Sequence, residues 1–186
     1  MKDPIQQAGS PILREIAREV PQKDFGSLKL RALVKKMSKV LAGEEFGVAL
    51  AAPQVGQSLR LFVISGRAFI SDLDEEERKM ASVPPDMVFI NPEIIRLSRK
   101  KKEMSEGCLS VRLKYGSVIR HERASVKAQD IDGQTFTYHG TGLIAHIFQH
   151  ECDHLEGILY IDKAEKLRDE RQKEKVRAEV NAENEA

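Results

Sequence analysis

Apolar side chains recur with a helical period in one early stretch of this chain. Between residues 27 and 43 they stand every three to four positions, at Leu30, Leu33, Val34, Met37, Val40 and Leu41. That spacing is typical of an amphipathic helix. Ser27 or Asp24 can cap its start, and Gly43 can end it. The sequence therefore predicts one N-terminal helix with a buried stripe and a basic outer face.

Strand patterns dominate the middle of the chain. The predicted strands are residues 61–64, 87–90, 125–129 and 135–138. The first two are continuous apolar runs, as in buried strands, and the second is expected to stop at Asn91-Pro92. The last two alternate apolar with polar residues, and Asp132-Gly133 between them predicts a hairpin turn.

The last apolar-periodic segment predicts a second helix, capped by Thr141 and ending at Gly157. Residues 158–161 are expected to be extended. From Lys163 onward the chain is mostly Lys, Glu, Arg and Ala, which predicts a C-terminal surface helix that frays into a tail. The charged residues 71–82 predict an exposed loop or short helix.

These elements predict an α+β fold, with mostly antiparallel β-sheets packed around the second helix. Residues 1–170 are expected to form a single domain, and residues 171–186 a charged helical tail. The fold would also contain the N-terminal amphipathic helix and the C-terminal helix.

Composition narrows the functional classes. The chain has 186 residues, a net charge of +1 and two cysteines. A charge this small does not favour binding to nucleic acid or a membrane surface, and the basic run at residues 99–102 fits a solvated turn. We find no apolar run long enough for a membrane span, no secretory signal in the first residues and no disulfide framework. These features favour the cytoplasm or an organelle matrix, and they predict no oligomeric state.

Candidate chemistry lies in the second predicted helix, where residues 150–154 read His-Glu-x-x-His. Residues four apart on a helix differ by roughly 40° and rise about 6 Å, so His150 and His154 stack on one face. Two imidazoles so placed can bind one divalent metal, with Glu151 close enough to reach a water on it. Leu143 and Ile147 share their face, which predicts that both histidines are buried.

A third metal ligand is left open by the residues alone. The candidates besides carboxylates are Cys108, Cys152, His121, His139 and His146. Cys152 lies roughly 200° from each motif histidine, so we expect it to pack in the core. Cys108 follows Gly107 in a predicted tight turn that could present a thiolate. Chance occurrence of the short motif and a purely structural metal site both remain alternatives.

Three segments together resemble the peptide deformylase family, in the order that the family has them. They are residues 47–54 (GVALAAPQ), residues 106–110 (EGCLS) and residues 149–155 (QHECDHL). Residues 11–14 and 90–93 are similar too, so the resemblance extends over about residues 9–170.

The resemblance implies a catalytic domain with a metal bound by Cys108, His150 and His154, and a fourth position open for water. Fe²⁺ is the metal it implies, with Ni²⁺ or Zn²⁺ as substitutes. Glu151 would be the general base and acid, while the Gln54 side chain and the Leu109 backbone N–H would stabilise the oxyanion.

The implied substrate is an N-formylmethionyl peptide or nascent chain, which points to translation, N-terminal protein processing and transient association with the ribosome. Six residues match substrate-binding positions: Gly47, Val48, Ala49, Leu143, His146 and Ile147. Glu106 and Arg120 match an ion pair that orients the site.

The chain departs from the family pattern at three places. Ala49 replaces the usual Gly, where a methyl group could crowd the peptide and disfavour a positive φ. Arg112-Leu113 stand where Pro-Gly is common, and residues 67–86 are long for a connection. The first two changes favour a second hypothesis, a deformylase-like protein that binds metal or peptide N-termini without useful turnover. A zinc endopeptidase is a third.

Overall fold

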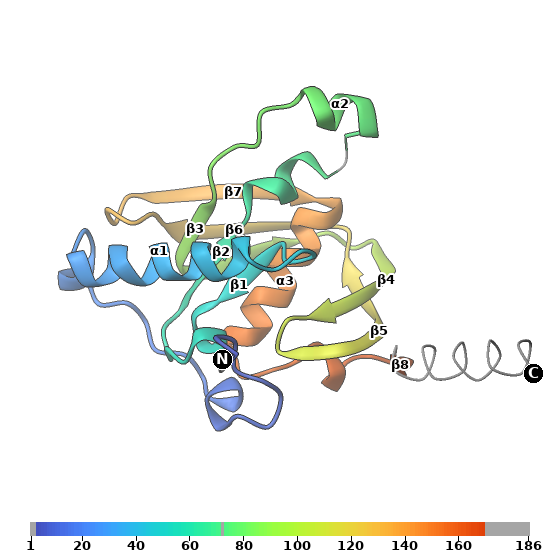
Figure 1. The fold of residues 1–186 in the computed structure, drawn as a ribbon, viewed down its shortest axis with the longest axis horizontal. Helices are drawn as coiled ribbons and strands as arrows, with labels where there is room; N and C mark the ends of the chain where they lie inside the picture. The colour runs from blue at the N-terminus through green and yellow to red at the C-terminus, as the bar shows by residue number, and fades with distance from the viewer. Residues whose placement is uncertain (1–2, 72, 170–186) are drawn as a thin grey trace, which may run out of the picture.

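The computed structural model describes residues 3–71 and 73–169. Its helices are α1 (Leu28–Ala42), α2 (Glu75–Met80) and α3 (Gly142–Leu155). Its strands are β1 (Ala49–Ala51), β2 (Leu61–Ile64), β3 (Met87–Leu97), β4 (Lys101–Cys108), β5 (Val111–His121), β6 (Arg123–Gln129), β7 (Thr135–Thr141) and β8 (Leu167–Asp169). Figure 1 shows these elements arranged around α3.

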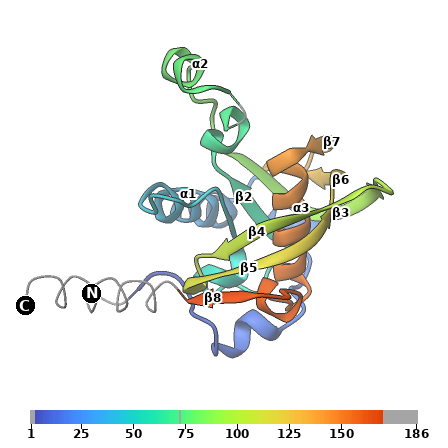
Figure 2. The same ribbon diagram turned by 90° about the vertical axis from the view of Figure 1, so that its right-hand side faces the viewer.

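Two antiparallel sheets flank the motif helix α3. The larger has the strand order β1-β2-β3-β6-β7, and the smaller has the order β4-β5-β8. Helix α3 contacts β1, β3, β6 and β7 of the first sheet and β5 of the second, and Figure 2 shows β4 and β5 crossing it. The predicted α+β fold, with mostly antiparallel sheets around this helix, is confirmed.

The larger sheet is covered on both faces, which explains the continuous apolar run of β2. Phe62 packs with Phe89 and Phe148 on the face toward α3. Leu61 and Val63 point the other way, into a second core cluster with α1. Successive strand residues point to opposite faces, so a strand buried on both sides needs apolar residues throughout.

Helix α1 begins as its sequence predicts. The Ser27 hydroxyl accepts a hydrogen bond from the Leu30 N–H at 3.2 Å, and Gly43 stands at the C-cap. Leu30, Met37 and Leu41 are buried, as the apolar stripe requires.

We expect Ser27→Ala to lower the free energy of unfolding by about 1 kcal/mol, because the Leu30 N–H loses its partner at the helix end. Urea unfolding followed by circular dichroism measures the change. Ser38→Ala on the same helix is the control, and an equal loss there would contradict the capping assignment.

Four local predictions need correction. Strand β3 does not stop at Asn91-Pro92: Asn91 adopts a φ of 49°, and the register of β3 against β6 shifts there. The Asn91 side chain accepts a hydrogen bond from the Val20 N–H and donates one to the Val20 carbonyl, and these two bonds stabilise the bulge. Residues 158–161 are not extended throughout: Leu159 is extended, but Tyr160–Asp162 form a 3₁₀ turn. Thr141 stands at the N-cap of α3 without a side-chain capping bond, since it also ends β7. The predicted basic turn is only partly a turn, because its last two lysines begin β4.

The predicted C-terminal helix is wrong over its described part. Leu167–Asp169 form β8, which pairs with Lys114–Gly116 of β5. The free edge of β5 offers backbone groups to a neighbouring strand, and this outweighs a helical composition. The remainder of the predicted helix, and the tail of residues 171–186, lie outside the described residues.

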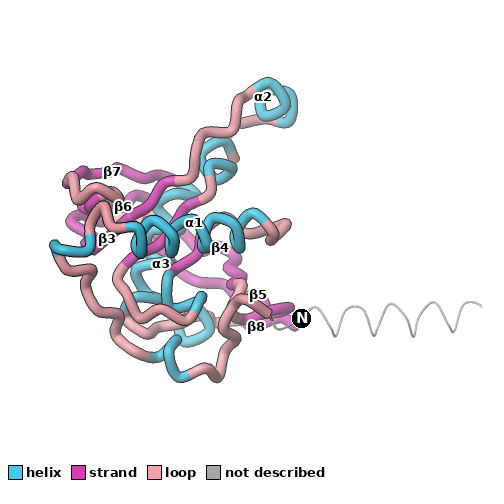
Figure 3. Tube along the Cα trace, turned by 60° about the vertical axis from the view of Figure 1, so that its left-hand side comes forward, coloured by secondary structure: helices cyan, strands magenta, loops and turns pink. Residues whose placement is uncertain are grey.

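Residues 66–86 form an excursion between β2 and β3. A 3₁₀ helix, Gly66–Ile70, is followed by α2, whose residues are all exposed. Figure 3 shows α2 held away from the body of the molecule. The expected exposed loop or short helix is therefore confirmed as a short helix. No described helix is both long and apolar enough to cross a membrane.

Candidate active site

The motif helix presents its two histidines side by side. The rings of His150 and His154 have centroids 4.9 Å apart. His154 is only 1% exposed, and Glu151 is buried as well. The expected burial of the two imidazoles is confirmed for His154, and His150 is nearly buried, with 12% of its side chain exposed.

Cys108 completes a cluster of three possible metal ligands. It ends β4, and its Sγ lies 3.2 Å from His154 Nε2. The donor atoms of Cys108, His150 and His154 all lie within 4.8 Å of one another. Of the non-carboxylate third-ligand candidates from the sequence, Cys108 is the one that lies with both motif histidines in this group.

The other candidates from the sequence point elsewhere. The His121 ring pairs with the Ser98 carbonyl, and the His139 ring with the Ser125 hydroxyl. Cys152 lies on α3 and packs against the core, where burial raises the pKa of its thiol to about 12. An inert thiol in that position fits the packing role expected of it.

The electrostatics of the cluster suit a cation. Burial by itself would raise the pKa of Cys108, but His154 and His150 outweigh it and hold that pKa well below its usual range. A thiolate with two imidazoles is a donor set that several divalent metals accept. Among the described residues, His154 Nδ1 and Glu151 Oε2 are buried without a hydrogen-bond partner. The residues present therefore fit a bound metal ion.

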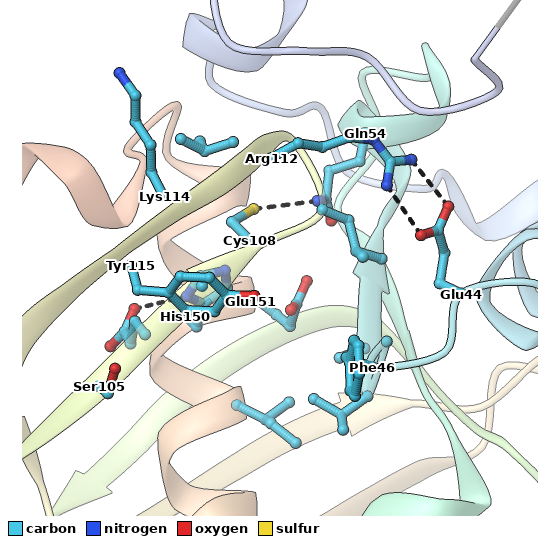
Figure 4. A pocket seen from close by; sticks show the side chains of 18 of the residues that line it. Glu44, Phe46, Gln54, Ser105, Cys108, Arg112, Lys114, Tyr115, His150 and Glu151 are labelled. Carbon is cyan, nitrogen blue, oxygen red and sulfur yellow. Dashed lines mark hydrogen bonds and ion pairs between the residues drawn. The ribbon is translucent and has the colours of Figure 1, made fainter. Parts of the chain in front are cut away.

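Glu151 has the environment of a general base. Burial raises the pKa of its carboxyl above the ordinary value. A carboxylate with a raised pKa and an unpartnered oxygen binds a proton more readily than a solvated one does. Glu151 also lines the pocket that contains Cys108 and His150 (Figure 4).

The side-chain amide of Gln54 is oriented by its neighbours. Gln54 is buried, and its Oε1 accepts the Ala51 N–H at 2.8 Å. Its Nε2 therefore faces the cluster, donating to Ser110 Oγ at 3.1 Å and lying 3.5 Å from Cys108 Sγ. A donor fixed in this way needs little reorganisation to bind a developing negative charge. Figure 4 shows Gln54 above the cluster.

Glu106 is the centre of a buried hydrogen-bond network. Its carboxylate accepts two bonds from Arg120, at 2.7 and 3.1 Å. It also pairs with His150 Nδ1 at 2.7 Å and with His146 Nε2 at 2.5 Å. Burial would raise the pKa of Glu106, but these partners lower it well below the usual range. Because His150 bonds through Nδ1, its Nε2 remains available to a metal.

The sequence did not reveal the outer part of this network. Asp153 pairs with Arg120 at 2.5 Å and with Lys163 at 2.7 Å, so alternating charges extend from His150 to the surface. Asp153 stands three residues after His150, on a neighbouring part of the helix surface, which was the available signal. His146 was both a candidate third ligand and an expected pocket residue; it lines the pocket, and its ring bonds Glu106.

A cavity of about 660 Å³ opens beside the cluster. The residues that resemblance placed in substrate binding all line it: Gly47, Val48, Ala49, Leu143, His146 and Ile147. Ala49 lies in β1 and pairs with Ile64 of β2. Among the described non-glycine residues, only Asn91 and Leu113 have a positive φ, so Ala49 does not. The expected backbone strain at Ala49 is therefore absent.

Comparison with known proteins agrees with this geometry. Residues 2–170 match the family model for polypeptide deformylase. The peptide deformylase of Dictyoglomus turgidum is 41% identical over 160 residues, covering 86% of this chain and 91% of that protein. The chloroplastic peptide deformylase 1A of Solanum lycopersicum is 36% identical over 162 residues, covering 86% of this chain and 58% of that protein.

A solved structure shows the same fold. The class I type b peptide deformylase of Acinetobacter baumannii, crystallised with Met-Ala-Ser bound, superposes with a TM-score of 0.74. It is 33% identical, and the match covers 88% of this chain and 98% of that one. Sequence, fold and the Cys-His-His cluster agree, and the chain belongs to the polypeptide deformylase family.

Proposed function

We propose that this chain removes the N-formyl group from the N-terminal methionine of newly made polypeptides and releases formate. The observation that carries this proposal is the cluster of Cys108, His150 and His154, with Glu151 beside it at the wall of the cavity. Three protein donors leave a position for water, which is the pattern of a catalytic site.

The contacts of Glu151 and Gln54 support their roles, and the family resemblance supplies the role of the Leu109 N–H. A metal ion bound by Cys108, His150 and His154 would supply a water that loses a proton near neutral pH. Glu151 accepts the proton from the attacking water and passes it to the leaving amine. As the formyl oxygen gains charge, the Gln54 amide and the Leu109 N–H donate to it.

The apolar part of the cavity suits a methionine side chain. Val48, Leu143 and Ile147 lie along it, next to the catalytic cluster. An unbranched thioether fits an irregular apolar pocket well. The Met-Ala-Ser bound to the related Acinetobacter enzyme is chemically a deformylated peptide of this kind.

Fe²⁺ is the metal we propose, with Ni²⁺ or Zn²⁺ as substitutes. Removal of the metal by a chelator should abolish turnover, and one equivalent of anaerobic Fe²⁺ or Ni²⁺ should restore it, since the proposed site holds a single ion. Metal content by plasma spectrometry, read beside activity, checks this. Full activity of the metal-free protein would contradict it.

Release of free amine from formyl-Met-Ala-Ser by metal-loaded protein tests the function. Acetyl-Met-Ala-Ser and a peptide with an internal amide bond are the controls. Turnover of the formyl peptide alone supports the deformylase. Cleavage of the internal bond would support the zinc endopeptidase instead. Metal binding without any turnover would favour the deformylase-like binding protein, to which Ala49 and Arg112 first pointed.

We further propose that the chain works where proteins are made, in a bacterial cytoplasm or an organelle matrix, with transient ribosome association. Deleting the charged residues from Lys173 onward should weaken co-sedimentation with ribosomes and leave turnover of short peptides unchanged. Equal co-sedimentation of the two forms would remove a docking role for this tail.

A further inference from the structure

The two residues that depart from the family's Pro-Gly pattern form a bulge at the rim of the active-site cavity. In the pairing of β4 with β5, Cys108 pairs with Val111 while Gly107 pairs with Tyr115. Arg112 and Leu113, with Lys114 after them, therefore have no partner on β4 in that register, and all three line the cavity. Bulges beside active sites commonly redirect a side chain.

Leu113 adopts a strained backbone conformation in this bulge. Its φ is 63°, in the left-handed region that non-glycine residues rarely adopt. Its side chain is 45% exposed, so burial in a core does not account for the strain. Strain that persists at the edge of an active site is a reason to look for a function there.

Arg112 fastens the bulge to the opposite side of the cavity. Its guanidinium donates two hydrogen bonds to Glu44, at 2.9 and 3.1 Å, and two to Asp3, at 3.0 and 3.3 Å. Figure 4 shows Arg112 and Glu44 joined beside the cavity. Asp3 is itself fixed by the Ile5 N–H, and Ile5 is buried.

A second arginine also contacts the cavity wall that contains Glu44. Arg67, from the long segment between β2 and β3, donates to the carbonyls of Glu44 and Gly47, at 3.2 and 3.3 Å. Residues 44–47 of the cavity wall are thus held by hydrogen bonds from both Arg67 and Arg112. Phe46 within it is 82% exposed, and it faces the rim with no core role.

On the basis of the proposed function, we propose that Arg112 and Leu113 determine how this enzyme binds the residues that follow the formyl-methionine. Arg112 fixes the distance between the bulge and residues 44–47. Leu113 then presents an apolar surface to the second and third residues of the peptide. The inner cavity at Val48 and Ile147 would bind methionine independently of this rim.

The test compares a short ligand with a long one. For each variant, KM is measured for formyl-Met amide, which ends before the rim, and for formyl-Met-Ala-Ser, which reaches it. Arg112→Gln is expected to raise the ratio of tripeptide KM to amide KM by about three- to tenfold, since it loosens contacts beyond methionine. Arg14→Gln, which breaks a similarly exposed pair with Asp162 away from the cavity, should leave the ratio unchanged.

Two further measurements separate this role from a structural one. Raising the ionic strength from about 0.05 M to about 0.5 M should raise the ratio in the wild type and not in Arg112→Gln, because exposed ion pairs are screened. Leu113→Asn should also raise the ratio while its melting temperature stays equal to or above that of the wild type, since Asn tolerates a positive φ. A variant that only damaged the fold would melt earlier.

An unchanged ratio in both Arg112→Gln and Leu113→Asn would overturn the rim proposal. The corresponding ratio of dissociation constants is measured for the products Met-Ala-Ser and methionine amide. This binding measurement requires no turnover. A wild type that fails to deformylate either substrate, yet shows the rim effect in product binding, would contradict the proposed function alone.

Discussion

Replacing Glu151 with glutamine is expected to lower kcat for formyl-Met-Ala-Ser by about 10²–10⁴, the usual contribution of a general acid–base group. Glutamine has nearly the same shape but cannot accept the proton of the attacking water. Formate release measures kcat, and plasma spectrometry should show that metal content is unchanged. A kcat within a few fold of the wild type would remove Glu151 from its proposed role.

The same variant should be more stable than the wild type. Burial raises the pKa of Glu151, so the ionised carboxylate is less stable in the folded protein than in water and lowers the free energy of unfolding. A neutral amide avoids that cost, and the metal-free variant should therefore melt at a higher temperature near neutral pH. A gain in stability with a loss of activity is typical of a catalytic residue and would not result from general damage to the fold.

Replacing Glu106 with glutamine should have the largest effect on stability. Arg120 is buried, and the variant would leave its charge paired with Asp153 alone, a carboxylate that Lys163 shares. Breaking a buried ion pair on one side typically costs about 3–5 kcal/mol. His150 would lose the partner that fixes its ring, and metal affinity should fall about 10–100-fold.

Urea unfolding of the metal-free protein measures the first effect, and competition with a chromogenic chelator measures the second. Glu122→Gln is the matched control, because that carboxylate pairs with the exposed Lys100 at the surface. Its expected cost is below about 1 kcal/mol. Equal losses for the two variants would show that the Glu106 network does not stabilise the fold.

Acid should reduce the difference between the wild type and Glu106→Gln. The pKa of Glu106 is lower in the folded protein than its unfolded value of about 4.3. Its contribution to stability is therefore complete above that unfolded value and is lost as the pH falls toward the folded pKa. Urea unfolding repeated from neutral pH down to about pH 3 should show the two proteins converging.

Local patterns were sufficient for the parts of this protein that depend on neighbours in sequence. The helical spacing of apolar residues located α1, and its cap and stop were correct because capping is a local interaction. The stacking of His150 and His154 followed from helix geometry, since residues four apart share a face in any α-helix. The burial of the motif helix between sheets followed from the same periodicity.

Cys108 marks the point at which sequence reasoning needed help. It lies on a strand of the smaller sheet, and no rule about neighbouring residues predicts its contact with helix α3. The family resemblance indicated Cys108 as a ligand, and in the fold its Sγ lies 3.2 Å from His154 Nε2. The Arg112 contacts to Glu44 and Asp3 join three separate segments and left no periodic signal in the sequence.

The sequence by itself determined the two long helices, four of the eight described strands (β2, β3, β6 and β7) and the pair of histidines, because these depend on side-chain periodicity and local geometry. Only the tertiary structure decided the pairing of Leu167–Asp169 as β8, the hydrogen bonds around Glu106 and the closed rim at Arg112. These features depend on which distant backbone edges and charges meet. The partners of a strand edge or a buried carboxylate depend on the tertiary structure and not on neighbours in sequence. For that reason Leu167–Asp169 form a strand although the composition of this segment favours a helix.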